Sequence, residues 1–282
     1  MLFQENIPMK EYTSLKIGGR ARWFSSPNNK EELKKVLSFA TTMDIPIFIL
    51  GSGTNTLIKD EGVKGMVIKL GGDFKNVEIQ NQEVKAGAGC LLSSLITQVS
   101  GFSLSGIETL YGIPGTVGGA VFGNAGCFGV QISDYVKAVT VMGNDGTEQI
   151  VKDVNFFYRG SSLKDKIILD VLFSLKKDVK WRIEEKINEA LKKRSTAQPV
   201  SAKTAGCIFK NPEGKFAGEL IEKAGFKGRS VGDAVISTKH ANFIENRGSA
   251  TSEDVISLIN MVKRRVWELY GVMLYEEIVI IN

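Results

Sequence analysis

The sequence predicts an α+β fold built from more than one domain, and three observations support this prediction. Strand and helix signals alternate over the first sixty residues, strand signals dominate from Val67 to Leu175, and two amphipathic helical segments follow. The chain has 282 residues, of which 43% are hydrophobic and 24% charged. Such a chain can bury a sizeable core divided between two or three domains.

Residues 1–66 are predicted to form a small α/β lobe. Asn28 or Asn29 can cap a helix, and the residues expected on its inward face are Leu33, Val36, Leu37 and Ala40. The β-favouring run 45–50 then predicts a buried strand that leads directly into Gly51.

Residues 67–194 are predicted to form a second lobe dominated by strands, with a short helix near Leu91 to Gln98 and a turn at Gly143 to Gly146. An amphipathic helix from Trp181 to Arg194 closes this lobe, and its expected inward residues are Ile183, Ile187 and Leu191. The Gln198-Pro199 pair stops that helix.

Residues 195–282 are predicted to form a third, smaller α+β domain. A helix capped near Thr251, with Asp254 three residues later, ends at Gly271. Its expected inward residues are Val255, Leu258, Val262, Val266 and Leu269. A final strand over residues 272–281 completes the prediction.

The glycine-rich segment from Gly112 to Gly129 is the most informative feature for function. Glycine costs conformational entropy on folding, so such a run is favoured where the backbone must turn with positive φ or approach a ligand closely. Backbone N–H groups in these turns form concave anion sites. A second glycine cluster, from Leu50 to Ile58, has the same character. Two phosphate-sized sites in one chain indicate a dinucleotide.

Composition excludes several other classes of function. The net charge is +5, with 36 basic and 31 acidic residues intermixed, which does not predict a nucleic-acid interface. The N-terminus lacks signal-peptide character and no apolar stretch reaches the length of a membrane span, so we expect a cytoplasmic protein. The cysteines Cys90, Cys127 and Cys207 lack metal-binding spacing and His240 is the single histidine, so we expect no metal site.

Tyr158 and Arg159 end an aromatic run. An arginine offers a planar fork that suits a carboxylate or a phosphate. The alternative is a surface arginine beside core aromatic residues.

Cys207 follows Ala205-Gly206, which we expect to form a turn into a short strand, with Lys203 and Lys210 nearby in sequence. Nearby positive charge would lower the pKa of the thiol and make it usable as an acid or a nucleophile. The alternative is a small buried apolar side chain.

Glu276 and Glu277 should point to opposite sides of the last predicted strand, so one of them can face inward. The alternative is a pair of solvated acids at a fraying end. His240 is expected to be a hydrogen-bonded structural residue, since nothing else in the chain supplies further metal ligands.

Taken together, these segments resemble one known family nearly end to end. The segments, in order, are TSLKIGGRA (residues 13–21), GSGTNTLI (51–58), GIPGTVGGAVFGNAGCFG (112–129), FYRGSS (157–162), QPVSAKTAGCIFKNP (198–212), LIEKAGFKG (220–228), KHANFIEN (239–246) and LYEEI (274–278). The chain resembles the UDP-N-acetylenolpyruvoylglucosamine reductases, flavoenzymes that make UDP-N-acetylmuramate for peptidoglycan. It is similar to the shorter, type II, form, because nothing corresponds to the inserted segment of the longer form.

The resemblance implies a two-lobed FAD-binding region of the vanillyl-alcohol-oxidase (PCMH) type followed by a substrate-binding domain. It implies that NADPH reduces a non-covalently bound FAD, which then delivers hydride to UDP-N-acetylglucosamine enolpyruvate. Arg159 and, less directly, Glu277 would act on the substrate carboxylate. Cys207 would donate the proton that completes the product, at a position where the family commonly has serine.

The resemblance also assigns binding residues. Those expected to hold FAD are Gly51, Ser52, Gly53, Thr54, Asn55, Gly112, Ile113, Pro114, Gly115, Thr116, Gly118, Gly119 and Asn124. Those expected to contact substrate are Tyr158, Lys203, Lys210 and Asn211. We expect a monomer that binds neither nucleic acid nor membrane. A sugar or alcohol oxidase on the same scaffold and a noncatalytic nucleotide-sugar sensor remain alternatives, which NADPH-driven flavin reduction and FAD uptake would distinguish.

Overall fold

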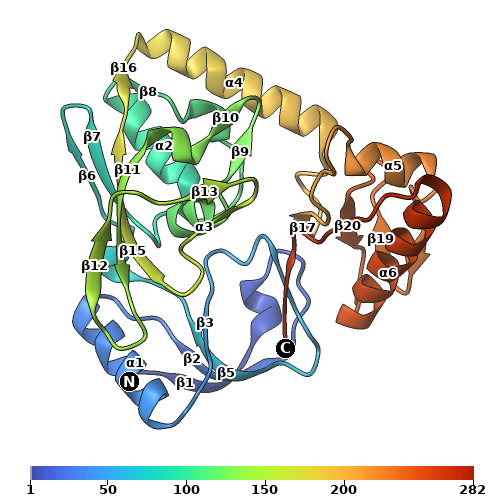
Figure 1. The fold of residues 1–282 in the computed structure, drawn as a ribbon, viewed down its shortest axis with the longest axis horizontal. Helices are drawn as coiled ribbons and strands as arrows, with labels where there is room; N and C mark the ends of the chain where they lie inside the picture. Colours follow the sequence, from blue (N-terminus) through green and yellow to red (C-terminus); the bar gives the residue numbers. More distant parts are fainter. Residues whose placement is uncertain (1) are drawn as a thin grey trace. The chain divides into compact units, whose positions relative to one another are not determined.

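The computed structural model describes residues 2–282, and the chain divides into two compact units (Figure 1). Unit 1 consists of residues up to Gln4, Trp23–Ser52 and Gly65–Arg194. Unit 2 consists of Glu5–Arg22, Gly53–Lys64 and Ser195–Asn282. Both units are therefore discontinuous in sequence.

The helices alternate with short strands along the whole chain. The helices are α1 (Lys30–Thr42), α2 (Leu92–Gly101), α3 (Val117–Phe122), α4 (Lys180–Ala197), α5 (Ala217–Lys223) and α6 (Ser252–Tyr270), with short 3-10 turns η1 (Met9–Tyr12), η2 (Gly72–Lys75), η3 (Glu108–Leu110) and η4 (Ile132–Tyr135). The strands of the first half are β1 (Gln4–Pro8), β2 (Arg20–Ser25), β3 (Ile47–Ile49), β4 (Thr56–Ile58), β5 (Val63–Ile68), β6 (Val77–Gln80), β7 (Glu83–Gly87), β8 (Leu104–Ser105), β9 (Gly126–Cys127), β10 (Val130–Gln131) and β11 (Val136–Met142). The remaining strands are β12 (Glu148–Val151), β13 (Phe156–Phe157), β14 (Gly160–Ser161), β15 (Ile167–Ser174), β16 (Lys176–Lys177), β17 (Thr204–Cys207), β18 (Ser230–Val231), β19 (Ala234–Ile236), β20 (Phe243–Asn246) and β21 (Val279–Ile281).

Unit 1 is built on a five-stranded sheet of order β12-β11-β15-β7-β6, in which every neighbouring pair is antiparallel. Alternate residues of β15 such as Val171 and Phe173 are fully buried, which is the pattern of a strand with one face on a core. Helices α2 and α3 supply further core residues, including Leu95 and Val117. One continuous apolar cluster therefore supports this unit.

The parallel pair β3 and β5 provides a second architectural feature. The pair aligns Ile47 with Met66 and Ile49 with Ile68, within a sheet of order β1-β2-β5-β3. Because the two strands are parallel, the loops that follow them leave the sheet at the same edge. The segment after β3 begins with Leu50, whose N–H donates to Ile68 O at 2.8 Å.

Unit 2 has its own core and a four-stranded sheet of order β17-β20-β19-β18. Helix α6 packs on β18 and β19, and α5 packs on α6 (Figure 1). Separately, β21 pairs in parallel with β4, with Val279 opposite Thr56. The apolar cluster of this unit joins Leu15 and Leu57 to residues of the C-terminal segment such as Val262.

The helices α1 and α6 begin with the caps that the sequence predicts. Asn29 caps α1 by accepting the Glu32 N–H, and all four residues expected on its inward face are buried. Thr251 and Asp254 form the expected capping box of α6, and Gly271 ends that helix in the left-handed conformation.

Three details of the secondary-structure prediction were wrong. Leu191 is 38% exposed because the buried stripe of α4 passes through Ile183, Ala190 and Arg194 and leaves Leu191 at its edge. Leu269 is 43% exposed at the last turn of α6. The strand predicted over residues 272–281 is confined to Val279–Ile281. The residues before it are joined to the rest of unit 2 by scattered backbone hydrogen bonds and not by a continuous ladder.

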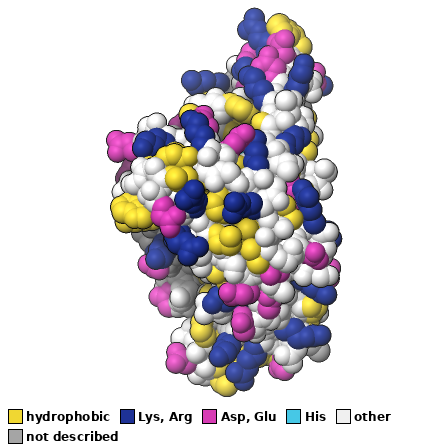
Figure 2. Space-filling view, turned by 90° about the vertical axis from the view of Figure 1, so that its right-hand side faces the viewer, with side chains coloured by type: hydrophobic (Ala, Val, Ile, Leu, Met, Phe, Trp, Pro, Cys, Tyr) yellow, Lys and Arg dark blue, Asp and Glu magenta, His cyan; other side chains and the backbone are white. Residues whose placement is uncertain are grey.

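The last passage of the chain from unit 1 to unit 2 falls between Arg194 and Ser195. Residues 1–66 contribute segments to both units. The division into two FAD-binding lobes, residues 1–66 and 67–194, and a substrate-binding domain, residues 195–282, stays a prediction. No helix within residues 2–282 is long and apolar enough to cross a membrane. Figure 2 shows one face of the molecule, on which basic and acidic side chains are interspersed.

Candidate functional site

Unit 1 brings the two glycine clusters into contact. A Cβ added to Gly51 would lie 2.8 Å from the Thr116 hydroxyl oxygen, so the loop after β3 lies directly against the start of α3. Thr116 caps α3 by accepting the Gly119 N–H at 3.2 Å. The backbone around both loops is therefore fixed by local contacts.

Some of these glycines are required by packing within the protein. A Cβ on Gly118 would lie 2.8 Å from the Cβ of Ala88. Gly112 has a φ of +86°, and a Cβ there would lie 3.3 Å from the Arg194 side chain. The glycine density thus has two causes. Positions 112 and 118 are closely packed against the protein, whereas other glycines, such as the exposed Gly119, leave the backbone surface uncovered.

Asn124 supplies a buried acceptor in the same segment. Its side-chain N–H₂ donates to Gln131 Oε1 at 2.8 Å and to Phe157 O at 3.2 Å. Its Oδ1 is buried and accepts no hydrogen bond from residues 2–282. A buried acceptor of this kind costs free energy unless a ligand supplies a donor.

Tyr158 and Arg159 form the two-residue turn of the β13–β14 hairpin, in which Phe157 pairs with Gly160. Arg159 has a φ of +57°, a conformation that costs free energy for a residue other than glycine. The Asn124 bond to Phe157 O holds the hairpin next to the glycine-rich segment. Two-residue hairpin turns favour residues with positive φ, so this conformation belongs to the turn that presents Arg159.

Unit 2 positions Cys207 at the end of β17. The strand begins at Thr204, before the expected turn, and its register shifts between Thr204 and Cys207, where Gly206 has a φ of +75°. Beyond Cys207 the side chain of Asn242 replaces a neighbouring strand. Its Oδ1 accepts the Phe209 N–H at 2.9 Å and its N–H₂ donates to Phe209 O at 2.8 Å.

Glu277 lies on the other side of the same segment. Its N–H donates to Ile208 O at 2.7 Å, so the residue after Cys207 is bonded directly to the backbone of Glu277. Glu276 forms an ion pair with Lys263 of α6 at 2.7 Å. Unit 2 therefore brings Cys207 and Glu277 together and gives Glu276 a partner of its own.

The loop residues Gly53 to Asn55 adjoin these groups. The Ser14 hydroxyl shares its one proton between Thr204 O at 2.7 Å and Gly53 O at 3.1 Å. The Asn55 side chain donates to Glu277 O at 3.1 Å. Gly53 has a φ of +64°, and a Cβ there would lie 2.1 Å from Tyr12 O, so no larger residue fits this turn.

The residues expected to contact the substrate are less closely grouped. Lys203 is exposed, and its carbonyl accepts the Asn246 N–H. The Lys210 N–H donates to Tyr275 O at 2.9 Å. Asn211 Oδ1 accepts the Ala217 N–H at 3.0 Å, which gives this side chain a role in its own loop. Tyr158 is 50% exposed at the tip of its hairpin.

His240 is structural in this fold. Its Nδ1 accepts the Asn242 N–H at 3.2 Å and its ring meets Phe243 edge-on. Burial lowers the pKa of His240 below its usual value, with a smaller effect from Lys227. The two other cysteines, Cys90 and Cys127, have pKa values raised by burial, which for Cys127 outweighs the nearby Arg194 and Arg159.

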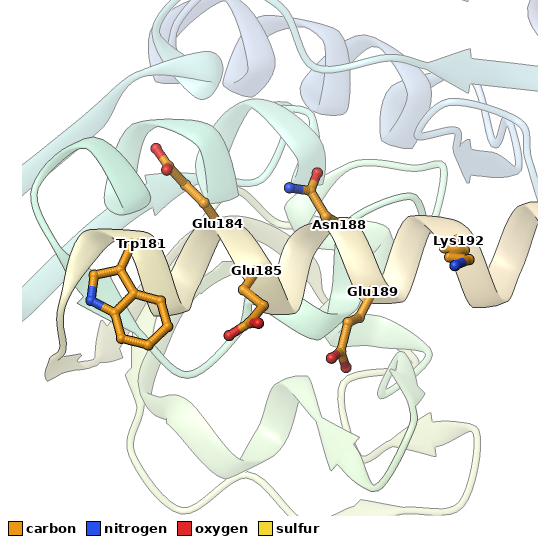
Figure 3. A pocket seen from close by; sticks show the side chains of 6 residues that line it. All are labelled: Trp181, Glu184, Glu185, Asn188, Glu189 and Lys192. Carbon is orange, nitrogen blue, oxygen red and sulfur yellow. The ribbon is translucent and has the colours of Figure 1, made fainter.

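A recess of about 420 Å³ lies along α4 and contains none of the predicted site residues. Its lining residues all belong to that helix and are Trp181, Glu184, Glu185, Asn188, Glu189 and Lys192. Figure 3 shows that their side chains diverge from the helix in different directions. They do not converge on a common ligand position.

Sequence reasoning missed three residues that the structure places at these loops, namely Ser14, Lys69 and Asn242. Ser14 and Asn242 bond to segments far away along the chain. Lys69 donates to Gly51 O at 2.6 Å. The one signal available for Lys69 is a lysine that directly follows a buried apolar run, Met66 to Ile68.

Two family models match separate parts of the chain. A family model described as UDP-N-acetylenolpyruvoylglucosamine reductase, C-terminal domain, matches residues 198–281, and one described as FAD binding domain matches residues 22–152. The UDP-N-acetylenolpyruvoylglucosamine reductase of Desulforamulus reducens is 42% identical over 99% of this chain and 93% of its own. Reductase 2 of Symbiobacterium thermophilum is 39% identical over 96% of this chain and 89% of its own.

A solved structure extends the agreement to three dimensions. The crystal structure of UDP-N-acetylenolpyruvylglucosamine reductase (MurB) from Thermus caldophilus matches with a TM-score of 0.87 and 38% identity, covering 99% of this chain and 100% of that one. The predicted fold class, an FAD-binding region of the PCMH type followed by a smaller α+β domain, is confirmed. The chain belongs to the UDP-N-acetylenolpyruvoylglucosamine reductase family.

Proposed function

We infer that this protein is a type II UDP-N-acetylmuramate dehydrogenase, which uses NADPH and bound FAD to reduce UDP-N-acetylglucosamine enolpyruvate in peptidoglycan precursor synthesis. The observation that carries this inference is the backbone contact between the segments of Cys207 and Glu277 in unit 2. The Glu277 N–H donates to the carbonyl of Ile208, the residue after Cys207, at 2.7 Å. The segments that carry the proposed proton donor and the proposed carboxylate are thereby adjacent.

The residues expected to hold FAD fit such a ligand. The buried Asn124 Oδ1 suits a ligand that carries hydrogen-bond donors. The cofactor supplies hydride transfer when bound. Main-chain N–H groups of residues 51–55 and 112–119 would hold it without a covalent link, so acid should release it intact.

We propose that Arg159 stabilises negative charge that develops on the substrate carboxylate. Donors fixed in advance at the site of developing charge supply a large part of most rate enhancements. The position of Arg159 on a hairpin that Asn124 ties to the glycine-rich segment supports this role. Tyr158 would border the pyruvyl or nicotinamide group.

Cys207 would donate a proton to the carbon next to the carboxylate. A thiol has an ordinary pKa of about 8.5, several units below that of an alcohol, so it can replace the serine that the family commonly has. Glu277 would orient the carboxylate and its proton network. Lys203, Lys210 and Asn211 are proposed contacts of the UDP phosphates.

The experiment that tests the function measures flavin absorbance at about 450 nm in the purified protein. We expect NADPH to bleach the band anaerobically and the enolpyruvyl substrate to restore it. Rapid bleaching by an alcohol, but not by NADPH, would indicate an oxidase. A colourless protein that takes up no FAD would indicate a nucleotide-sugar sensor.

We also propose a cytoplasmic monomer. Light scattering of the purified protein should give a mass close to the 30.8 kDa of one chain. A mass near twice that value at micromolar concentration would contradict this proposal. Fractionation of source cells, with a known cytoplasmic enzyme measured alongside, tests the location.

A further inference from the structure

The lysine at the end of β5, Lys69, lies beside the glycine loop that follows β3. The two strands are parallel, and Ile49 of β3 lies opposite Ile68 of β5. Ligands of open α/β sheets bind at the carboxyl ends of parallel strands. The lysine is held there by its own backbone, since its N–H donates to Ser25 O at 2.9 Å.

The ammonium of Lys69 points at this loop. Nζ donates to Gly51 O at 2.6 Å, and the side chain is partly buried. Within residues 2–282, the Lys69 ammonium makes this one hydrogen bond, and no carboxylate forms an ion pair with the ammonium. An ammonium has three donors, so two remain for a ligand.

The surroundings of the ammonium lack a compensating negative charge. Burial lowers the pKa of Lys69, and the positive charge of nearby Lys75 lowers it further. A partly buried cation is unfavourable unless an anion accompanies it. A partly buried lysine whose ammonium is held at a glycine turn therefore marks a place prepared for an anionic ligand.

We propose that Lys69 is a cofactor-binding residue whose ammonium pairs with the pyrophosphate of FAD at the Gly51–Ser52 turn. The proposal deepens the proposed function and rests on it. The ammonium holds the Gly51 carbonyl with one donor and a phosphate oxygen with another, which fixes the turn while the turn's N–H groups face the same anion. The chemistry recognised is a diphosphate, which FAD carries and riboflavin does not.

A purely structural role makes a different prediction. If Lys69 served only to fix the Gly51 carbonyl, its loss would weaken the binding of every flavin by the same factor. If it pairs with the pyrophosphate, its loss weakens FAD binding and spares riboflavin. Lys75, on η2, is exposed and close to Lys69. The variant Lys75→Met therefore removes one nearby positive charge and leaves the hydrogen bond between Lys69 and the loop in place.

The test uses the full-length chain freed of flavin and titrates FAD by quenching of flavin fluorescence, followed by riboflavin and by inorganic pyrophosphate as a competitor. For Lys69→Met we expect FAD affinity to fall roughly 10- to 100-fold, with riboflavin affinity within about twofold of the parent. Lys69→Arg should keep most of the FAD affinity, because it retains a cation with several donors. Inorganic pyrophosphate should compete with FAD in the parent and less in Lys69→Met.

Several outcomes would overturn the proposal. They are FAD affinity in Lys69→Met within about threefold of the parent, equal losses in Lys69→Met and Lys75→Met, or equal losses for FAD and riboflavin. Should riboflavin bind too weakly to measure, a lowered melting temperature of flavin-free Lys69→Met together with failure of Lys69→Arg would count against it. A parent protein that binds no FAD would instead overturn the proposed function.

Discussion

Cys207 is the residue at which this chain departs from the pattern expected of its family. Its position is set from both sides, by Asn242 on the following residues and by Ser14 on Thr204. A side chain placed so firmly, yet only half-buried, suits a proton donor better than a residue that only fills the core. The two roles predict opposite orders among its variants.

We expect Cys207→Ala to keep normal reduction by NADPH while turnover falls by about 10²–10⁴, the range for loss of a general acid. Cys207→Ser should recover much of that loss because it keeps a proton at the same position. Stopped-flow absorbance with NADPH and then substrate measures both phases. A merely packed cysteine would be replaced better by alanine than by a buried hydroxyl, so Ala exceeding Ser would contradict the proposal.

Arg159 and Glu277 are expected to act in the same second phase. Arg159→Ala and Glu277→Gln should accept electrons from NADPH at a normal rate but pass them to substrate about 10²–10⁴ times more slowly. Glu276→Gln is the matched control, since Glu276 is already paired with Lys263. Equal slowing of both phases would give Arg159 and Glu277 a structural role. A larger effect at Glu276 than at Glu277 would make Glu276 the acting glutamate.

At the scale of elements, α4 is anchored to the loop region of unit 1 by a buried carboxylate. Glu108 is 4% exposed and accepts hydrogen bonds from Lys186 of α4 at 2.8 Å, from Ser105 at 2.7 Å and from the Gly106 N–H. Burial alone would raise the pKa of Glu108, but these hydrogen bonds outweigh it and the pKa is lowered. The anchor lies in η3, shortly before the glycine-rich segment.

A double-mutant cycle tests this anchor. Lys186→Met should cost about 1–3 kcal/mol in the free energy of unfolding, because it leaves a buried carboxylate with fewer donors. In Glu108→Gln the removal of Lys186 should cost much less. Urea denaturation gives the four values. Additive losses would mean that Lys186, whose side chain is 44% exposed, contributes nothing through Glu108.

The elements also show what sequence can and cannot predict. The caps at Asn29 and Thr251 were predictable, because each depends on residues within one helical turn. The strand over residues 272–281 was not, because Glu277 bonds to Ile208 and Val279 to Asn55, contacts between distant parts of the chain. Lys69 was missed for the same reason, since its partner Gly51 lies in the loop that follows another strand, β3.

At the scale of the whole molecule, each unit holds a titratable group whose shifted pKa should make stability depend on pH, in a different pH range. In unit 2, His240 has a lowered pKa in the folded state. Its contribution to stability is present above the unfolded value of about 6.5 and is lost as pH falls below that value. In unit 1, Glu108 contributes above its unfolded pKa of about 4.3, and this is lost as pH falls through its lower folded pKa.

The expected outcome is that unit 2 weakens on mild acidification, and that His240→Gln reduces this effect. Trp267 lies in α6 of unit 2, so its fluorescence reports that unit once Trp23 and Trp181 are changed to Phe. Urea midpoints at pH 7.5 and pH 5.5 should differ more in the parent than in His240→Gln. The same difference in both proteins would exclude His240 as the cause.

The pairing of β21 with β4 has a consequence for biosynthesis on the ribosome. Thr56 pairs with Val279, which is synthesised more than two hundred residues later. The early segments of unit 2 therefore leave the exit tunnel long before the segments that they pair with are made. At about 5–20 residues per second, residues 195–282 require roughly 4–18 s. During that interval Leu15 and Leu57, both fully buried in the finished protein, remain accessible to chaperones, whereas every segment of unit 1 has already been synthesised.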